Sequence, residues 1–173
     1  MIKSFCVVFG FFFYSFYLSQ SSQKIDSTYT FNKNIQINPI IDSIITYSKT
    51  FIGTPYKYSG SDPSGFDCSG FVSYVFSNFG FRLSRSSSEL SKVGESISLS
   101  NIQPGDLMFF KGRNINSSGV GHVALVIEVF PTTLKFIHSA SGGVKIEDFK
   151  SSKYYTQRYI NTKRIDYLSK YNK

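Results

Sequence analysis

The stretch Phe66-Asp67-Cys68-Ser69-Gly70-Phe71-Val72 decides the fold of this chain, because a buried helix begins inside it. Asp67 stands where a helix N-cap is expected, which puts Cys68 in the first helical turn. Peptide dipoles at a helix start favour negative charge, and a thiolate gains from that position. We therefore interpret Cys68 as a nucleophile. The apolar residues that follow it at helical spacing are Phe71, Val72, Val75, Phe76 and Phe79.

The N-terminal end is typical of an export signal. One positive residue, Lys3, precedes an apolar run over residues 5–18, and small polar residues follow the run. The run is short for a membrane span, so we expect residues 1–22 to be a cleaved signal peptide and expect no stable span afterwards; an uncleaved anchor is the alternative. Cleavage would also remove Cys6, the only other cysteine, and leave Cys68 without a disulfide partner.

The order of predicted elements indicates an α+β domain. Helical patterns cover residues 39–51, the stretch from Cys68 to a C-cap at Gly80, and a short capped helix at 87–92. A turn-rich loop over residues 53–65 lies before the cysteine and would form a substrate wall. Strands are predicted after the turn Pro104-Gly105-Asp106, at residues 107–110, 122–129, 134–140, 144–146 and 159–165. This order predicts N-terminal helices packed on a small antiparallel sheet.

Length and charge set the domain organisation and the class of partner. The 173 residues indicate one domain over residues 39–168, with a flexible lead-in at 23–38 and a basic tail at 169–173. The net charge of +8 favours an anionic partner such as nucleic acid, a membrane surface or an acidic polymer. We find no nucleic-acid-binding motif and therefore predict no nucleic-acid partner. We expect a monomer.

The chain has only two histidines, and strand parity places them together. His122 and His138 lie in two strands joined by the turn residues 130–133. If the turn centres on Pro131 or Thr132, even-numbered residues face even-numbered residues, and the two histidines become near-diagonal neighbours on one sheet face. A slip of one residue would break that parity.

Two histidines beside a thiol suit nucleophilic catalysis. A free thiol has a pKa of about 8.5, so an imidazole is needed to take its proton. A second polar group must then hold the ring in the correct tautomer. We assign His122 as base and later general acid, because it begins its strand after a Gly-rich loop, and His138 as the orienting residue; the reverse assignment is the alternative. A metal site is the other use of one cysteine and two histidines, but the ligands lack close spacing, so we predict no metal and no cofactor.

Several motifs together resemble the NlpC family of papain-like cell-wall cysteine peptidases. The resemblance covers residues 39–165. It implies a papain-like fold, a Cys68–His122–His138 triad and cleavage of peptidoglycan stem peptides, typically between γ-D-glutamyl and a diamino acid. The matching blocks are Gly53-Thr54-Pro55-Tyr56, Gly65-Phe66-Asp67-Cys68-Ser69-Gly70-Phe71-Val72, Leu83-Ser84-Arg85-Ser86-Ser87, Gln103-Pro104-Gly105-Asp106-Leu107, Gly121-His122-Val123-Ala124 and Phe136-Ile137-His138-Ser139-Ala140.

The resemblance also implies substrate contacts. Tyr56 matches a tyrosine that lines the cleft, and Asp67 and Ser69 match positions that help to bind a free stem-peptide amine. Tyr56 could instead be core packing and Asp67 only an N-cap. Two loop residues depart from the family pattern, since Ser59 stands where glycine is frequent and Ser84 where proline is frequent.

With the export signal and the cysteine and histidines, the resemblance implies an exported cysteine endopeptidase that hydrolyses stem peptides through a thioester acyl-enzyme, in the periplasm, the cell envelope or outside the cell. The backbone N–H of Cys68 is the expected oxyanion donor. Arg85 could pair with a substrate carboxylate or with Glu89, and the sequence leaves both open. Two alternative functions also remain: an amidase or acyltransferase with the same triad, and a non-catalytic wall-binding module with an unreactive Cys68.

Overall fold

The computed structural model describes residues 39–166, which lie in the second of two compact units of the chain, residues 37–173. The predicted signal peptide, the lead-in and the basic tail fall outside the described residues, so those predictions stay predictions. Within residues 39–166, no helix is both long and apolar enough to cross a membrane.

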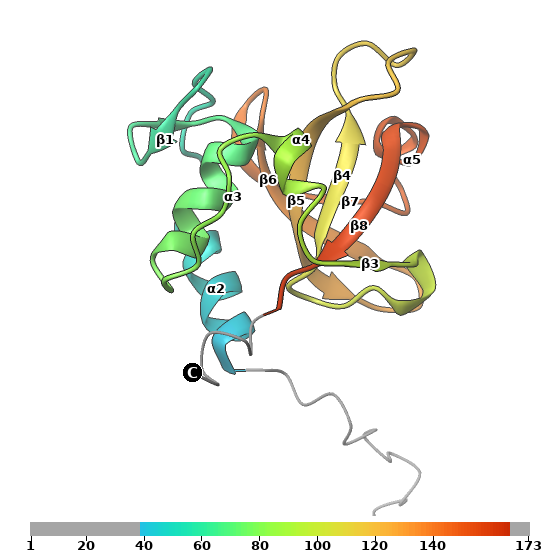
Figure 1. Cartoon of the computed structure of the whole chain (residues 1–173), viewed down its shortest axis with the longest axis horizontal. Helices are drawn as coiled ribbons and strands as arrows, with labels where there is room; N and C mark the ends of the chain where they lie inside the picture. Colours follow the sequence, from blue (N-terminus) through green and yellow to red (C-terminus); the bar gives the residue numbers. More distant parts are fainter. Residues whose placement is uncertain (1–38, 167–173) are drawn as a thin grey trace, which may run out of the picture. The chain divides into compact units, whose positions relative to one another are not determined.

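The elements follow the predicted order of helices and then strands (Figure 1). A two-stranded hairpin before the cysteine helix is formed by β1 (Ser61–Asp62) and β2 (Gly65–Phe66). The helices are α2 (Pro39–Lys49), α3 (Cys68–Ser77), α4 (Ser87–Leu90) and α5 (Lys153–Arg158), and a 3₁₀ turn covers Leu99–Asn101. The main strands are β3 (Glu95–Ile97), β4 (Leu107–Lys111), β5 (Val120–Val129), β6 (Leu134–Ala140), β7 (Gly143–Asp148) and β8 (Tyr159–Arg164).

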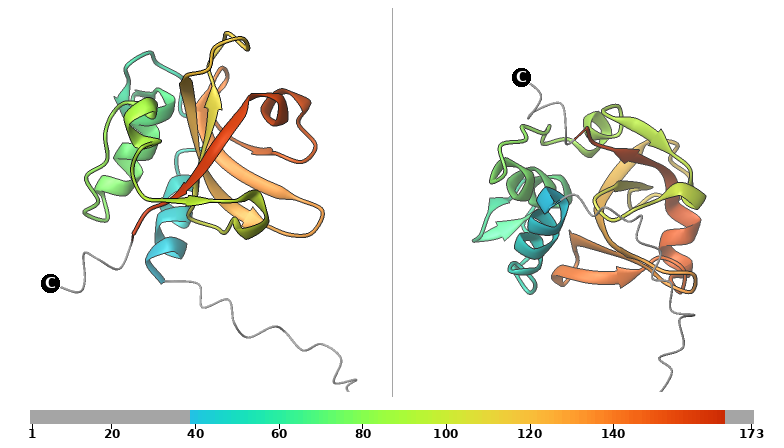
Figure 2. Two further views of the ribbon diagram at one scale, coloured as in Figure 1. Left: turned by 45° about the vertical axis from the view of Figure 1, so that its right-hand side comes forward. Right: turned by 90° about the horizontal axis from the view of Figure 1, so that it is seen from below.

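The six main strands form one antiparallel sheet in the order β3-β8-β4-β5-β6-β7. Helices α2 and α3 lie side by side on one side of this sheet, and α5 lies away from them, where β8 begins (Figures 1 and 2). The α+β class predicted from the sequence is therefore confirmed.

Residue parity along the strands separates two hydrophobic cores. In β4 the odd residues Leu107 and Phe109 pack in the core that includes Phe71 and Val75 of α3. The even residues form a second core: Met108, Phe110, Ala124, Val126 and Phe136, with Tyr155 of α5. This alternation is the period-2 pattern of a strand that is buried on both faces. The even-numbered histidines therefore belong to the face that carries Phe110, Phe136 and Tyr155.

Helix α3 begins at Cys68 as predicted, and Gly80 ends it. The helix closes at Ser77, and Phe79, predicted on its buried face, lies in the following turn. The Phe81 amide donates to the Phe76 carbonyl at 3.1 Å and the Gly80 amide to the Ser77 carbonyl at 2.9 Å. These two bonds, with a φ of 78° at Gly80, form a Schellman ending, which glycine permits because it has no Cβ.

Other boundaries differ from the predicted ones. Helix α2 ends at Lys49 and α4 at Leu90, each two residues earlier than predicted. Strand β5 begins at Val120, so the prediction that His122 starts its strand is wrong: β5 still pairs with Lys111 of β4 there, after a register irregularity. Strand β7 extends to Asp148. The structure also contains three elements that were not predicted from the sequence: the hairpin β1–β2, strand β3 and helix α5.

A β-bulge brings the two histidines into register. Near the turn, Val129 faces Leu134 and Glu128 faces Lys135, a pairing of opposite parity. The register then shifts between Val126 and Glu128, and Val126 faces Phe136. Ile127 is thus the extra residue of a bulge. Beyond it, even-numbered residues face even-numbered residues, as predicted for the histidines.

An ion pair between the buried Asp106 and the half-buried Arg164 ties the turn before β4 to the end of β8. Asp106 is 1% exposed, and its two oxygens accept from Nε and Nη2 of Arg164 at 2.7 and 2.9 Å. One of these oxygens also accepts from the Gln103 amide at 2.8 Å. The pair is bidentate, the strongest geometry for arginine and carboxylate. It fixes the start of β4, whose far end runs beside His122.

Candidate active site

Cys68 is the first residue of α3, and hydrogen bonds fix the two residues that precede it. The Asp67 carboxylate caps the helix by accepting from the Gly70 amide at 2.6 Å. The Lys57 amide donates to the Phe66 carbonyl, and the Phe66 amide donates to the Pro55 carbonyl, both at 3.0 Å. A Cβ at Gly70 would lie 2.0 Å from the Gly60 carbonyl oxygen, so only glycine allows this approach. The cysteine is thus fixed by backbone contacts.

The surroundings of the Cys68 thiol affect its pKa in two opposite directions. Burial raises the pKa of the Cys68 thiol, and the nearby Asp67 carboxylate adds to the rise. The backbone amides of Val123, Ser69 and Cys68 itself act in the opposite direction. The helix start does favour a thiolate, as predicted, but burial is the larger effect. The resting thiol therefore carries its proton and needs a base.

His122 and His138 form a direct contact. Nε2 of His122 lies 2.8 Å from Nδ1 of His138, and the two rings are nearly perpendicular at 81°. In the β6–β5 register His138 stands opposite Ala124, two residues from His122, so the histidines are diagonal neighbours. Because Nε2 of His122 is occupied, its Nδ1 is the ring nitrogen left for another group.

His138 is an uncharged imidazole inside an aromatic pocket. Its side chain is fully buried, with the rings of Phe136 and Tyr155 at centroid distances of 5.1 and 5.3 Å. Burial lowers the pKa of His138, and the neighbouring His122 and Lys145 lower it further. Burial likewise lowers the pKa of His122 to about 4, with a smaller contribution from Lys145. Both rings are therefore neutral near pH 7.

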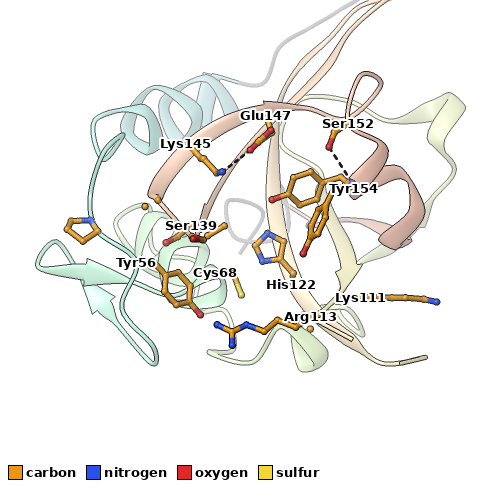
Figure 3. A pocket seen from close by; sticks show the side chains of 18 of the residues that line it. Tyr56, Cys68, Lys111, Arg113, His122, Ser139, Lys145, Glu147, Ser152 and Tyr154 are labelled. Carbon is orange, nitrogen blue, oxygen red and sulfur yellow. Dashed lines mark hydrogen bonds and ion pairs between the residues drawn. The ribbon is translucent and has the colours of Figure 1, made fainter. Parts of the chain in front are cut away.

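Cys68 and His122 open into one cleft of about 980 Å³. Figure 3 shows the Cys68 sulfur between the ring of Tyr56 and the ring of His122. The loop before the hairpin β1–β2 contributes Pro55 and Tyr56, β7 contributes Lys145 and Glu147, and α5 contributes Tyr155. Such a concave site with titratable groups at its floor is where catalysis is expected.

The sequence model of the NlpC/P60 family matches residues 53–164, which is more than half of the chain. The chain belongs to the NlpC/P60 family. The resemblance drawn from the motifs is confirmed. The members of this family are cysteine peptidases, so the predicted enzyme class, a hydrolase, is confirmed at the level of the family.

Three curated relatives illustrate the range of the family. A gamma-DL-glutamyl hydrolase of Bacillus subtilis is 37% identical over 70% of this chain, and a gamma-D-glutamyl-L-lysine dipeptidyl-peptidase of Bacillus cereus is 34% identical over 61%. This chain spans 29% and 31% of their lengths. A probable endopeptidase of Haemophilus influenzae is 32% identical over 87% of this chain and 92% of its own length.

The solved structures confirm the fold. The NlpC/P60 domain of the peptidoglycan hydrolase SagA superposes with a TM-score of 0.60 at 28% identity, covering 72% of this chain and 98% of that domain. The predicted papain-like arrangement, with helices followed by an antiparallel sheet, is that of an NlpC/P60 domain.

Tyr56 lies at the cleft rather than in the core. Its side chain is exposed and lines the cleft beside Cys68, and residue 56 forms an isolated parallel bridge with Phe66. Burial raises the pKa of the Tyr56 phenol, and the charges of Cys68 and Asp67 add to the rise. The alternative of pure core packing is excluded, whereas contact with a substrate stays a prediction.

Asp67 and Ser69 are engaged within the protein. The Asp67 oxygen that caps α3 lies 3.2 Å from the Ser69 hydroxyl, which in turn lies 2.7 Å from the Arg85 carbonyl oxygen. Ser69 is buried, and neither residue lines the described cleft. These contacts account for both residues as structural, and their predicted role in binding an amine stays a prediction.

Arg85 does not pair with Glu89, one of the two partners that the sequence left open, and its pairing with a substrate carboxylate stays a prediction. Its guanidinium donates to the Ser59 carbonyl at 3.0 Å, while Glu89 pairs with Lys92 at 2.7 Å. Ser59 adopts a φ of 57°, the left-handed region, which agrees with the glycine that is frequent there in NlpC/P60 proteins. Arg85 thus fastens the strained loop that precedes Cys68.

Tyr155 belongs to the site but was not predicted from the sequence. Its hydroxyl lies 3.5 Å from both ring nitrogens of His138, too far and too symmetric for a directed hydrogen bond, and its ring stacks over His122 at 6.1 Å. Tyr155 therefore encloses both histidines. The Ser152 hydroxyl, which caps α5 by accepting from the Tyr155 amide, was the available signal. Among the described residues, no group of three or more His, Cys, Asp or Glu is arranged to hold a metal ion.

Proposed function

We propose that this NlpC/P60 protein is an exported cysteine endopeptidase that hydrolyses peptidoglycan stem peptides at the bond between γ-D-glutamyl and a diamino acid. One observation carries the proposal: Cys68, at a helix start, shares a cleft with a histidine whose far nitrogen is held by a second, buried histidine. This is the arrangement that thiol acyl transfer requires.

Names of relatives support the substrate. Two of the relatives are named for γ-glutamyl bonds, and a further one, from Bacillus subtilis, is named a probable peptidoglycan endopeptidase. SagA is named a peptidoglycan hydrolase. Peptidoglycan lies outside the cytoplasmic membrane, so the proposed substrate agrees with the export signal predicted over residues 1–22 and with an envelope or extracellular location.

The proposed roles follow from the tautomer that the histidine contact permits. His122 donates its Nε2 proton to Nδ1 of His138, which leaves Nδ1 of His122 unprotonated. That nitrogen takes the Cys68 proton as the sulfur attacks the γ-carbonyl carbon. The opposite tautomer would leave a proton on Nδ1 and no base, so His138 acts as the orienting residue.

Bond making and breaking then balance without a cofactor. The tetrahedral oxyanion is stabilised by backbone N–H groups at the start of α3, among them that of Cys68. His122 returns the proton to the departing amine, the C–N bond breaks, and a thioester remains on Cys68. Water, deprotonated by His122, hydrolyses the thioester and restores the thiol.

The test is digestion of purified muropeptides with the secreted protein and with the variant C68A, followed by mass spectrometry of the products. We expect the wild type to release a new diamino-acid amine and the variant to release none. Equal products from both proteins, or none from the wild type, would refute the proposal. Products of cleavage between N-acetylmuramic acid and alanine would identify an amidase, and a product in which two peptides are joined would identify an acyltransferase. A parallel digest of poly-γ-glutamate completes the test, because cleavage of that polymer alone would identify a different γ-glutamyl hydrolase.

A further inference from the structure

Three basic side chains line the cleft around Cys68, and the lining includes a single acidic side chain. The basic residues are Lys111 and Arg113, at the end of β4 and in the loop after it, and Lys145 on β7. The acidic residue is Glu147, also on β7. A cleft with this excess of positive charge attracts anionic groups.

Two of the three cations already have partners. Nζ of Lys145 lies 2.9 Å from a carboxylate oxygen of Glu147, and Nζ of Lys111 donates to the Ile115 carbonyl at 3.0 Å. Arg113 differs from both, because within residues 39–166 its guanidinium has no hydrogen-bond or ion-pair partner. Arg113 is exposed at the cleft, so the N–H donors of its guanidinium are unused by the described part of the protein.

Arg113 lines the same cleft as the Cys68 sulfur. Figure 3 shows the Arg113 guanidinium next to the phenol of Tyr56 and on the same side of the cleft as Cys68. Electrostatics agree with this placement: burial raises the pKa of the Tyr56 phenol, and the positive charge of Arg113 opposes that rise. When the scissile carbonyl of a substrate is held at Cys68, a carboxylate close to that carbonyl would thus come within reach of Arg113.

We propose that Arg113 binds a free carboxylate of the substrate next to the scissile bond and thereby makes the enzyme prefer stem peptides whose carboxyl groups are not amidated. This inference rests on the proposed function. A stem peptide offers two such carboxylates, the α-carboxylate of the D-glutamyl residue and the carboxylate of the diamino acid. Arginine recognises either by two parallel N–H···O bonds, which a carboxamide cannot accept in the same way.

The experiment compares kcat/KM of the wild type, R113Q, R113K and R82Q on three synthetic stem tripeptides. One tripeptide has both carboxylates free, one carries a D-isoglutamine in place of D-glutamate, and one has an amidated diamino acid. Arg82 is exposed and outside the cleft, so R82Q removes the same charge without touching the site. The folded state of each variant is checked by its urea-unfolding midpoint.

We expect R113Q to lower kcat/KM on the free tripeptide roughly tenfold to hundredfold, the range of a charge-assisted pair, and R113K to recover part of the loss. One of the two carboxylates is the one that Arg113 binds. Amidation of that carboxylate should lower kcat/KM of the wild type and leave kcat/KM of R113Q unchanged. R82Q should match the wild type. Equal losses by R113Q on all three tripeptides, or no loss at all, would overturn the inference. No cleavage of any tripeptide by the wild type would instead refute the proposed function.

Discussion

The 2.8 Å contact between Nε2 of His122 and Nδ1 of His138 exists because of one inserted residue in β5. Next to the turn, the two strands pair with opposite parity, which would send the histidines to different faces of the sheet. The bulge at Ile127 restores equal parity on the side of the histidines. The bulge therefore belongs to the geometry of the proposed catalytic site as much as to the fold.

Replacing His138 should separate its orienting role from its packing role. We expect H138A to lower kcat about 10²–10⁴-fold, because His122 loses the partner that selects its tautomer. We expect H138N to recover part of that loss, since the amide oxygen of asparagine can accept a hydrogen bond from Nε2–H of His122. The measurement is kcat on a stem tripeptide at constant pH.

The control for this prediction is F136L, which removes volume from the same aromatic pocket but no hydrogen bond. It should lower stability and leave kcat within a few-fold of the wild type. If F136L and H138A were equally slow, the loss would come from packing and the orienting role of His138 would be wrong.

Much of this site could be predicted from local sequence. Asp67 as N-cap, Cys68 as the first helical residue and the side-chain parity of two strands all depend on residues close together in the chain. The pairing of β8 with β4 and β3 could not be predicted, because these strands are separated by many residues and no turn signal joins them. Tyr155 was missed for the same reason: its role depends on where α5 meets the sheet.

The direction of the thiol pKa illustrates a second limit. A helix start favours the thiolate, and that can be inferred from sequence. The burial that outweighs it depends on how the loop of Tyr56 and strand β5 close over Cys68, which only the folded chain determines.

The lowered pKa of His122 predicts activity that persists in acid. The proposed mechanism requires the base form of His122, and its pKa of about 4 places the acid limb of kcat/KM near that pH rather than near the usual value of about 6.5. The raised pKa of Cys68 moves the alkaline limb in the opposite direction, so the plateau should be wide. A pH series of kcat/KM in constant-ionic-strength buffers measures both limbs. An acid limb at pH 6 to 7 would show that the burial of His122 is not felt in solution.

Ser59 should be a position where glycine stabilises the protein. A residue with a side chain is destabilised by roughly 1–2 kcal/mol in the left-handed backbone region, and glycine removes this strain. Glycine also gives the unfolded chain more conformational freedom, which offsets about 0.5–1 kcal/mol of that stabilisation. We therefore expect S59G to raise the free energy of unfolding by roughly 0.5–1 kcal/mol, read from urea denaturation. The bond from Arg85 is to the Ser59 carbonyl, so it survives the change.

The mirror-image control is G53A, at a residue with a φ of 89° where an added Cβ would meet no atom within 4 Å. Without any steric clash, this variant should lose about 1 kcal/mol through backbone strain alone. If S59G and G53A shifted the unfolding midpoint in the same direction, backbone conformation would not be the cause.

The ion pair between Asp106 and Arg164 should contribute far more to stability than an exposed pair. The variant D106A removes the bidentate acceptor of the Arg164 guanidinium and the acceptor of the Gln103 amide, so we expect a loss of about 3 kcal/mol. The comparison is E89A, which breaks the exposed Lys92 pair and should cost at most about 0.5 kcal/mol. Urea unfolding of both variants decides the matter. Because Asp106 lies outside the cleft, the D106A protein that remains folded should keep the pH profile of kcat/KM of the wild type. A shift of the acid limb of kcat/KM in D106A would mean that the start of β4 also controls the position of His122.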